Sequence, residues 1–275
     1  MCRSKTWSSK KPKSSDFAGR SAPPAMPNLP HNPNLGPLHN LFASDLHLAA
    51  ERPQIMAQFL AFTTDIAPQA AALYILGDLF EYWAGDDDSD PLGAQTAAAL
   101  STLARRGTKV FLMQGNRDVL MAGAFAARSG ATLIGDPLLI DLHGTPTLLT
   151  HGDALCTDDA DYQRFRAYAR DPGNQQRFLA QPLETRREQM LGMRAQSEAS
   201  KQQKTETIMD VAPAAVEDLL RHHNYPRLIH GHTHRPARHV HQLDGHTCER
   251  WVLNDWYQRG GYLRVDAQGC TAILL

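Results

Sequence analysis

Short motifs of aspartate, histidine and asparagine follow apolar runs at five places in this sequence. They are Asp45-Leu46-His47, Gly77-Asp78, Gly115-Asn116-Arg117-Asp118, His151-Gly152-Asp153 and His230-Gly231-His232-Thr233-His234. Buried strands of an open α/β sheet present ligand-binding residues at their carboxyl ends, so we expect these side chains to meet at one edge of a sheet. Each motif alone is weakly informative. The ordered set together predicts a centre that holds two metal ions.

The residue types narrow the metal and its chemistry. Carboxylates, imidazoles and an amide oxygen, with no thiolate, favour Mn²⁺, Fe or Zn²⁺ over softer metals. One carboxylate can bridge two cations, and Asp78, at the end of the apolar run 73–76, is the candidate for that bridge. A pair of metals roughly 3.5–4 Å apart is a common device for hydrolysing phosphate esters. Asn116 would add a neutral oxygen, which leaves the positive charge of the centre available to polarise a phosphate.

Apolar periodicity predicts alternating strands and helices in the first half of the folded chain. The expected strands are 38–44, 73–76 and 109–113, and the expected helices are 53–66, 94–106 and 119–128. This alternation is typical of layered α/β folds. Further strands are expected at 137–142, 147–150, 227–229, 237–243, 247–253 and 262–265. The β-rich end of the chain therefore predicts a second sheet that packs against the first.

Residues 158–210 interrupt this alternation. The segment contains no convincing strand, and Pro172 and Pro182 divide it into several expected helices rich in Arg, Gln and Met. Its basic residues suit phosphate groups and an anionic membrane surface, and its apolar residues suit acyl chains or the membrane interface. A plain helical cap that packs on the core is the alternative. We expect a core of residues 38–157 and 211–275, a helical insertion or lid of residues 158–210, and a disordered N-terminal extension of residues 1–37.

Composition argues against several classes of protein. The chain has 275 residues, a formal net charge of -1 and no long pattern of basic residues, which disfavours a nucleic-acid partner. Its four cysteines are scattered without a CxxC pair, which disfavours a disulfide framework and a cysteine-based zinc site. No apolar run approaches the ~20 residues needed to span a bilayer, and the basic N-terminus lacks the apolar stretch of a secretory signal. We expect a monomer that contacts a membrane only peripherally.

The order DxH, GD, GNxD, HGD and GHTH resembles that of the calcineurin-like metallophosphoesterases, from about residue 40 to residue 235. The resemblance implies a four-layer αββα sandwich that carries the helical insertion. It also implies two ligand sets around one bridging carboxylate. The first metal would be held by Asp45, His47, Asp78 and His234, and the second by Asp78, Asn116, His151 and His232. A hydroxide shared by the metals would be the nucleophile, because metals lower the pKa of water.

One residue departs from the pattern of that family. Many members have a histidine after the Asn of GNxD, where it is thought to protonate the leaving group, and this chain has Arg117. Arginine does not give up its proton in this pH range, so the leaving group should need none. A phosphate monoester, with a second pKa of about 6, meets that requirement, and an alkoxide does not. Arg117 therefore favours a diphosphate substrate whose oxygens it clamps. The alternative is a structural pair between Arg117 and Asp118.

The chain resembles a narrower branch of the family in the segments GDLFEYWAGDD, GNRD, HGDALCTDD and IHGHTHRP and in residues 197–204. That branch hydrolyses the diphosphate bond of UDP-2,3-diacylglucosamine, a lipid-linked sugar nucleotide of lipid A biosynthesis, by attack on the α-phosphorus. The resemblance implies two Mn²⁺ ions per subunit, with Fe or Zn²⁺ as alternatives, and UMP and 2,3-diacylglucosamine 1-phosphate as products. It also implies a peripheral location on the cytoplasmic face of the bacterial inner membrane. A dinuclear phosphoesterase for a soluble nucleotide diphosphate remains the alternative, whereas a non-catalytic scaffold is disfavoured because every expected ligand is present.

The same resemblance assigns roles to individual residues. Catalysis would involve Asp78, Asn116, Arg117 and His232. The substrate would contact Asn116, Arg117, Asp159, Tyr162, Ser197, Lys201, Lys204 and His232. The position of Lys201 varies within the branch. From the residues alone, Asp153 lies close enough to His151 in the sequence to orient it as an outer partner.

Overall fold

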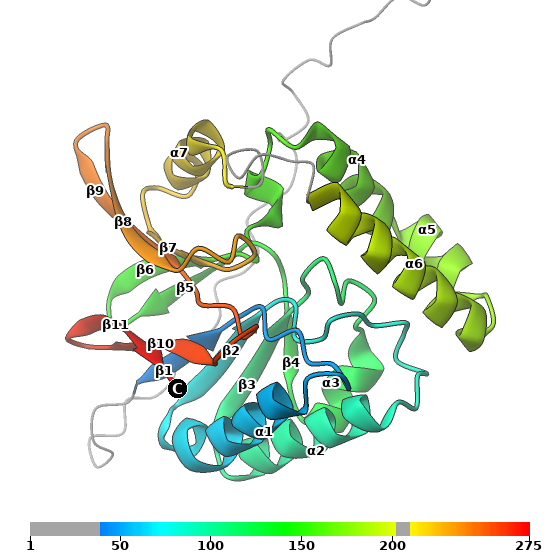
Figure 1. Ribbon diagram of the computed structural model, residues 1–275. Coiled ribbons are helices and arrows are strands. Elements are labelled where there is room, and N and C mark those ends of the chain that lie inside the picture. Colours follow the sequence, from blue (N-terminus) through cyan, green and yellow to red (C-terminus); the bar gives the residue numbers. More distant parts are fainter. Residues whose placement is uncertain (1–38, 202–209) are drawn as a thin grey trace, which may run out of the picture. The chain divides into compact units, whose positions relative to one another are not determined.

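A computed structural model describes residues 39–201 and 210–275 of the chain. The expected N-terminal extension of residues 1–37 lies outside these residues, as does Lys204. Two β-sheets and the helices that cover them make up most of the described part (Figure 1). Across both described ranges, no helix combines the length and the apolar character needed to cross a membrane.

The first sheet has six strands in the order β11-β10-β1-β2-β3-β4. Their bounds are Asn40–Ala43 for β1, Ala72–Leu76 for β2, Lys109–Met113 for β3, Thr132–Ile134 for β4, Gly261–Asp266 for β10 and Gly269–Leu274 for β11. Strands β1 to β4 run parallel, and β10 and β11 pair antiparallel. Because β1, β2 and β3 are parallel neighbours, the motifs that follow them emerge at one edge of the sheet.

The second sheet has five strands in the order β5-β6-β7-β9-β8. Their bounds are Leu138–Leu142 for β5, Thr145–Leu149 for β6, Arg227–His230 for β7, Ala237–Leu243 for β8 and His246–Val252 for β9. Strands β6, β7 and β9 run parallel, and β5 and β8 pair antiparallel with their neighbours. The HGD motif follows β6 and the GHTH motif follows β7, so this sheet supplies histidines to the site.

The layers follow from the alternation of side chains along the central strands. Leu73 and Ile75 of β2 pack toward the helices, whereas Tyr74 and Leu76 face the second sheet. Successive residues of a strand point to opposite faces, so a strand buried on both faces reads as a continuous apolar run. The helices that cover the first sheet are α1 (Pro53–Ala61), α2 (Pro91–Arg105) and α3 (Gly123–Ser129), and α7 (Pro213–His222) covers the second. The expected four-layer αββα sandwich is confirmed.

The described residues between β6 and α7 include three consecutive α-helices, which we call the insertion helices (Figure 1). They are α4 (Ala160–Ala169), α5 (Pro172–Leu179) and α6 (Leu183–Lys201). The side chain of Asp159 accepts a hydrogen bond from the backbone N–H of Tyr162, and Asp171 caps α5 in the same way. Such caps satisfy N–H groups that the start of a helix leaves without a partner. The bounds 158–210 of the insertion stay a prediction.

Some helices and strands differ from those expected. The helix expected at 53–66 is α-helical only to Ala61 and continues as a π-helix over Phe62–Ile66. The helix expected at 119–128 begins at Gly123. The sequence-based expectations include none of β4, β11 and α7. The two strands contain no buried residue, whereas α7 buries Val216 and Leu220 at helical spacing.

Candidate metal centre

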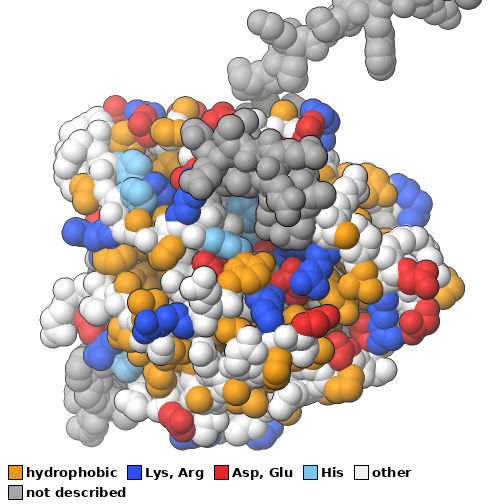
Figure 2. Space-filling model, in the orientation of Figure 1, with side chains coloured by type: hydrophobic (Ala, Val, Ile, Leu, Met, Phe, Trp, Pro, Cys, Tyr) orange, Lys and Arg blue, Asp and Glu red, His pale blue; other side chains and the backbone are white. Residues whose placement is uncertain are grey.

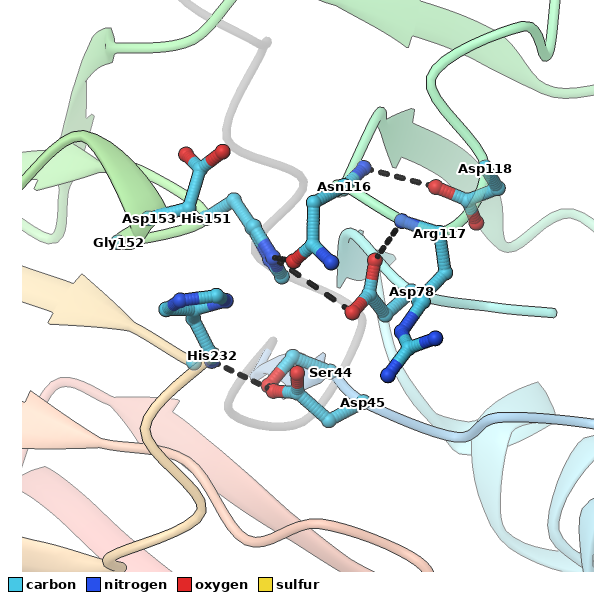
Figure 3. Close-up of polar contacts among 12 residues, drawn as sticks. Ser44, Asp45, Asp78, Asn116, Arg117, Asp118, His151, Gly152, Asp153 and His232 are labelled. Atoms are coloured by element: carbon cyan, nitrogen blue, oxygen red, sulfur yellow. Dashed lines mark hydrogen bonds and ion pairs between the residues drawn. The ribbon is translucent and has the colours of Figure 1, made fainter. Parts of the chain in front are cut away.

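The predicted metal ligands all lie just beyond strand ends of the two sheets. They are Asp45 and His47 after β1, Asp78 after β2, Asn116 after β3, His151 after β6, and His232 and His234 after β7. Figure 3 shows that the side chains of Asp78 and Asn116, which follow strands of the first sheet, point toward that of His151, which follows a strand of the second. The carboxyl ends of strands far apart in the sequence therefore meet at one place, as the motifs predict.

Within residues 39–201 and 210–275, two groups of three side chains have the geometry to hold a metal ion. One group consists of Asp45, His47 and His234, and the other of Asp78, His151 and His232. We call them the His47 group and the His151 group. Within each group the candidate ligand atoms all lie within 4.8 Å of one another. Asp78 Oδ2 faces both, because it lies 3.8 Å from His47 Nε2 and 3.7 Å from His151 Nε2. That position suits a bridging carboxylate.

Asp45 has one oxygen bonded to the protein and one directed at the site. Its Oδ2 accepts hydrogen bonds from Ser44 Oγ at 2.6 Å and from the backbone N–H of His232 at 2.8 Å (Figure 3). Its Oδ1 is buried and has no hydrogen-bond partner among the described residues. That oxygen lies 3.4 Å from His234 Nε2 and 3.9 Å from His47 Nε2. A buried oxygen that faces two imidazole nitrogens fits a cation bound between them.

The GNRD loop is bonded to the carboxylate of Asp78 through its backbone. The N–H of Arg117 donates to Asp78 Oδ1 at 2.8 Å. The amide oxygen of Asn116 lies 3.1 Å from His151 Nε2, so both atoms face the same point (Figure 3). The structure thus places Asn116 beside the His151 group, where the sequence predicts it.

Asp118 bonds to the backbone of this loop on the side away from the ligand groups. Its carboxylate accepts the backbone N–H of Gly115 at 2.7 Å and that of Leu79 at 2.8 Å. In Figure 3 the guanidinium of Arg117 extends away from Asp118, and its Nη1 lies 3.9 Å from Glu81 Oε1. Asp118 therefore holds the backbone of the loop, and the side chain of Arg117 is directed elsewhere.

The outer partner of His151 is a backbone carbonyl. Its Nδ1 lies 2.9 Å from the carbonyl oxygen of Leu76, which fixes the proton on Nδ1 and leaves Nε2 for the site. Leu76, rather than Asp153, supplies this bond. Asp153 instead accepts hydrogen bonds from the Tyr162 hydroxyl at 3.0 Å and Arg166 Nε at 2.9 Å. The carboxylate expected to orient a ligand therefore holds the first insertion helix.

Five of the predicted ligands have a left-handed backbone conformation. They are Asp45 (φ 54°), His47 (φ 49°), Asp78 (φ 53°), His232 (φ 68°) and His234 (φ 54°). Residues other than glycine seldom adopt this conformation, and it persists only where surrounding contacts hold it. Close packing explains two of the motif glycines. A Cβ atom on Gly115 would lie 2.0 Å from Asp78 Oδ1, and one on Gly231 would lie 2.2 Å from Asp45 Oδ2.

The carboxylates give the site a negative potential. Burial opposes the charged form of His151, yet Asp78 and Asp45 raise its pKa to about 9. Burial also opposes ionisation of Asp45, but His234 and the other histidines hold its pKa well below the usual range. Burial and the neighbouring His151, by contrast, lower the pKa of His232 to about 4. The buried carboxylates stabilise positive charge at His151, and a site that contains them suits divalent cations.

A cavity of about 690 Å³ opens beside both groups. Its polar lining includes His47, Asp78, Asn116, Arg117, His232 and His234. Its apolar lining includes Val119 and Leu120 of the core and Phe165, Phe178, Met190 and Met193 of the insertion helices. On the face shown in Figure 2, histidines and charged side chains of both signs gather near the middle, next to hydrophobic side chains. The cavity thus joins a polar end to an apolar wall.

The predicted substrate contacts are only partly described. Asp159 and Tyr162 line the cavity, and the ring of Tyr162 lies 5.5 Å from that of His232. Ser197 and Lys201 belong to the last turns of α6, and the structure describes only their backbone. The roles assigned to these residues stay predictions.

Three residues near the His47 group carry no prediction from the sequence. Glu81 is buried, and its Oε2 lies 3.3 Å from His47 Nδ1. The rings of Tyr257 and His47 stack with their centroids 4.8 Å apart, and Arg194 Nε lies 3.3 Å from Glu81 Oε1. A carboxylate within the apolar segment LFEYW is a signal for Glu81, since burial of a charge requires partners. Arg194 and Tyr257 have no comparable signal.

Comparison with known proteins agrees with this geometry. Residues 39–236 match the model of the family described as calcineurin-like phosphoesterase. The UDP-2,3-diacylglucosamine hydrolase of Aromatoleum aromaticum is 54% identical over 229 residues, which are 83% of this chain and 94% of the relative. The protein of the same name from Chromobacterium violaceum is 51% identical over 236 residues, or 85% and 98%. The one from Xanthomonas campestris pv. campestris is 50% identical over 236 residues, or 83% and 96%.

The family match extends over well more than half of the sequence and includes every predicted metal ligand. The family implies a dinuclear metal site, and the two ligand groups supply candidate residues for it. The chain belongs to the calcineurin-like phosphoesterase family.

Proposed function

We propose that the chain hydrolyses the diphosphate bond of UDP-2,3-diacylglucosamine and releases UMP and 2,3-diacylglucosamine 1-phosphate for lipid A biosynthesis. Relatives named for hydrolysis of this compound are 50% to 54% identical over most of both chains. The observation that carries the proposal is the cavity, which joins both ligand groups to an apolar wall on the insertion helices.

Both parts of the cavity match such a substrate. The diphosphate belongs at the polar end, and the acyl chains belong against Phe165, Phe178 and Met193. Burial of each methylene group contributes about 0.8 kcal/mol, so acyl chains lie more stably in the apolar part than in water. The volume of about 690 Å³ is also typical of cavities that hold small ligands. A soluble nucleotide diphosphate would leave the apolar wall uncovered.

Two cations complete the proposed site. One is assigned to Asp45, His47, Asp78 and His234, and the other to Asp78, Asn116, His151 and His232. When bound, the cations lower the pKa of the attacking water and neutralise charge on the phosphate. Mn²⁺ is the proposed metal, with Fe or Zn²⁺ as alternatives, because the donors are oxygen and nitrogen atoms.

Arg117 is assigned to the phosphate groups of the substrate. Its side chain lines the cavity beside Asn116 and His232. A guanidinium keeps its proton at neutral pH, so Arg117 neutralises charge and fixes phosphate oxygens through paired hydrogen bonds. The departing sugar 1-phosphate needs no proton at that pH. Asp159, Tyr162, Ser197, Lys201 and Lys204 are assigned to the remainder of the substrate.

A peripheral position on the cytoplasmic face of the inner membrane follows from the same substrate. Phe165, Tyr168, Leu179 and Leu191 are exposed on the insertion helices although they are large and apolar. Exposed apolar side chains next to arginines suit the surface of an anionic membrane, where the acyl chains of the substrate lie. The insertion helices are therefore assigned both to the acyl chains and to the membrane surface.

The test is hydrolysis by purified protein that has been stripped of metal with a chelator and then supplied with Mn²⁺. We expect release of UMP from UDP-2,3-diacylglucosamine in mixed micelles, and much slower release from UDP-glucose. Equal rates on the two substrates would favour the alternative of a soluble nucleotide diphosphate. In ¹⁸O-labelled water the label should enter UMP, because the attack is on the α-phosphorus. Label in the sugar 1-phosphate would contradict that assignment.

A further inference from the structure

Glu81 is a buried carboxylate without a place in the proposed reaction. Its side chain is 2% exposed, and its backbone N–H donates to the carbonyl oxygen of Leu48 at 3.1 Å. A buried carboxylate is costly unless cations and hydrogen-bond donors surround it. Its partners therefore indicate what it does.

The two oxygens of Glu81 face different parts of the molecule. Oε2 lies 3.3 Å from His47 Nδ1 and 2.6 Å from Arg52 Nη2, both in the core. Oε1 faces the cavity, 3.3 Å from Nε of Arg194 on α6 and 3.9 Å from Nη1 of Arg117. One carboxylate thus contacts a candidate metal ligand, the arginine assigned to phosphate and an insertion helix.

The contact with His47 is an ion-pair distance of 3.3 Å, and His47 Nδ1 is buried without a hydrogen bond of good geometry among the described residues. The charge of Glu81 nevertheless bears on which ring nitrogen is available to the site. A carboxylate beside Nδ1 favours a proton there, and Nε2 is then left without one. That Nε2 faces the site, 3.3 Å from His234 Nε2 and 3.8 Å from Asp78 Oδ2. A carboxylate partner also makes an imidazole a stronger ligand than a neutral partner does.

The contacts with Arg117 and Arg194 balance charge at the mouth of the cavity. Both guanidiniums lie within 4 Å of one carboxylate oxygen, and without that charge they would repel each other. Arg194 also gives α6 a contact near the site. Other attachments of α6 lie earlier in the helix, where buried Arg186 pairs with Asp87, Arg187 pairs with Asp88 and Met190 packs against the core.

We propose that Glu81 is a positioning residue that couples the docking of α6 over the cavity to the alignment of His47 and Arg117. When α6 is docked, Arg194 occupies Oε1, and the carboxylate is held with Oε2 toward His47. When α6 moves away, Glu81 loses a cation and its hold on both partners weakens. The inference rests on the proposed function for the identity of the substrate, whereas the coupling itself is measurable with Mn²⁺ alone.

The first measurement is binding of Mn²⁺ to metal-free protein by calorimetry. Glu81→Gln keeps the shape of the side chain and removes its charge, and we expect one of two sites to weaken by roughly 10- to 100-fold. The other site should keep its affinity. Glu51→Gln, which changes an exposed glutamate four residues after His47 in the chain, is the matched control and should bind as the wild type does. Unchanged affinity at both sites in folded Glu81→Gln would overturn the proposal.

The second measurement is a double-mutant cycle between the helix and the core. Arg194→Gln should weaken the same Mn²⁺ site by at least about twofold, because coupled residues interact by ~0.5 kcal/mol or more, and it should raise KM for the diacylated substrate. In the Glu81→Gln background, Arg194→Gln should have no further effect on Mn²⁺ binding. Two independent effects that add in the double variant would overturn the coupling.

Folding and function are separated by two further comparisons. Arg194 is about one-third exposed, so Arg194→Gln should fold even if Glu81→Gln does not. Unchanged Mn²⁺ binding in Arg194→Gln would contradict the coupling. Faster hydrogen exchange in α6 of the variant would support it. Wild-type protein that fails to hydrolyse the substrate would refute the proposed function alone, since the Mn²⁺ cycle needs no substrate.

Discussion

The His47 group and the His151 group hold their buried histidines by different means. Nδ1 of His47 faces the carboxylate of Glu81, whereas Nδ1 of His151 faces the backbone carbonyl of Leu76. A backbone carbonyl remains whichever side chains surround it, but a carboxylate carries a full charge and has other partners. The orientation of His47 therefore depends on the side chains around Glu81, whereas the orientation of His151 depends on the backbone of the fold.

The aromatic side chains that pack on the two groups come from different parts of the molecule. Tyr257 of the core stacks on His47, and the guanidinium of Arg52 lies 4.6 Å from the Tyr257 ring centre. The His151 group is covered by Tyr162 of α4, whose ring approaches His232. The insertion helices therefore contact the His151 group directly and reach the His47 group through Glu81 and Arg194.

The largest expected effect comes from Asp78, whose Oδ2 faces both groups. Asp78→Ala should lower both Mn²⁺ stoichiometry and turnover, with turnover falling by more than the ~100-fold that loss of an outer partner can cost. Asp45→Ala, which touches one group, should leave one ion bound. Elemental analysis and UMP release would measure both. One retained ion in Asp78→Ala at wild-type affinity would show that Asp78 does not bridge.

Arg117→Ala should lower kcat by roughly 10²-fold, because it removes a charge-stabilising donor aimed at the phosphate. Its backbone N–H, which donates to Asp78, is retained in the variant. Both groups should therefore keep their Mn²⁺ content, as measured by elemental analysis. Loss of a metal ion would contradict the assignment of the side chain to phosphate.

Metal binding should also stabilise the fold, because the ions bind the folded protein and neutralise the buried carboxylates Asp45 and Asp78. At a Mn²⁺ concentration 100 times the dissociation constant, the stabilisation should be about 2.7 kcal/mol per site. A chelator should therefore lower the Tm measured by calorimetry, and Mn²⁺ should restore it. The shift should shrink in Asp45→Ala and nearly vanish in Asp78→Ala.

The smallest expected effect concerns the contact between α4 and the His151 group. Tyr162→Phe removes the hydroxyl that donates to Asp153, and hydrogen bonds to charged groups contribute about 1.5 kcal/mol or more, so KM should rise by up to about tenfold. Arg166 still holds Asp153, which limits the loss. Tyr225→Phe, which removes a similar bond to Asp244 on the surface, is the matched control and should leave kinetics unchanged. Equal effects of the two variants would show that Tyr162 acts only on stability.

Much of the core and the position of the candidate ligands could be predicted, because parallel strands deliver their motifs to one edge. Asp45 and Asp78 follow β1 and β2, and each has a carboxylate oxygen within 4 Å of His47 Nε2. The only sequence signal for this arrangement is an apolar run followed by a polar motif. The sandwich follows from the same runs, since strands buried on both faces are continuously apolar.

The outer partners could not be predicted, because they depend on contacts between distant segments. Arg194 meets Glu81 only once α6 has packed over the core, and Leu76 meets His151 only once the two sheets have packed together. Neither contact has a local pattern. A backbone carbonyl in particular is present at every residue, so the acceptor beside His151 leaves no mark in the sequence.

The left-handed backbone at five ligand positions implies a trade-off between the stability of the fold and its activity. Glycine adopts that conformation more easily than aspartate or histidine does. A substitution of Asp45, His47 or Asp78 by glycine would therefore relieve backbone strain, but it would also remove a ligand and abolish the reaction. Proteins are seldom at their stability optimum, and strained active-site residues are one reason. Replacement of these ligands by glycine should therefore relax the backbone of the metal-free protein while removing the side chains assigned to the metals.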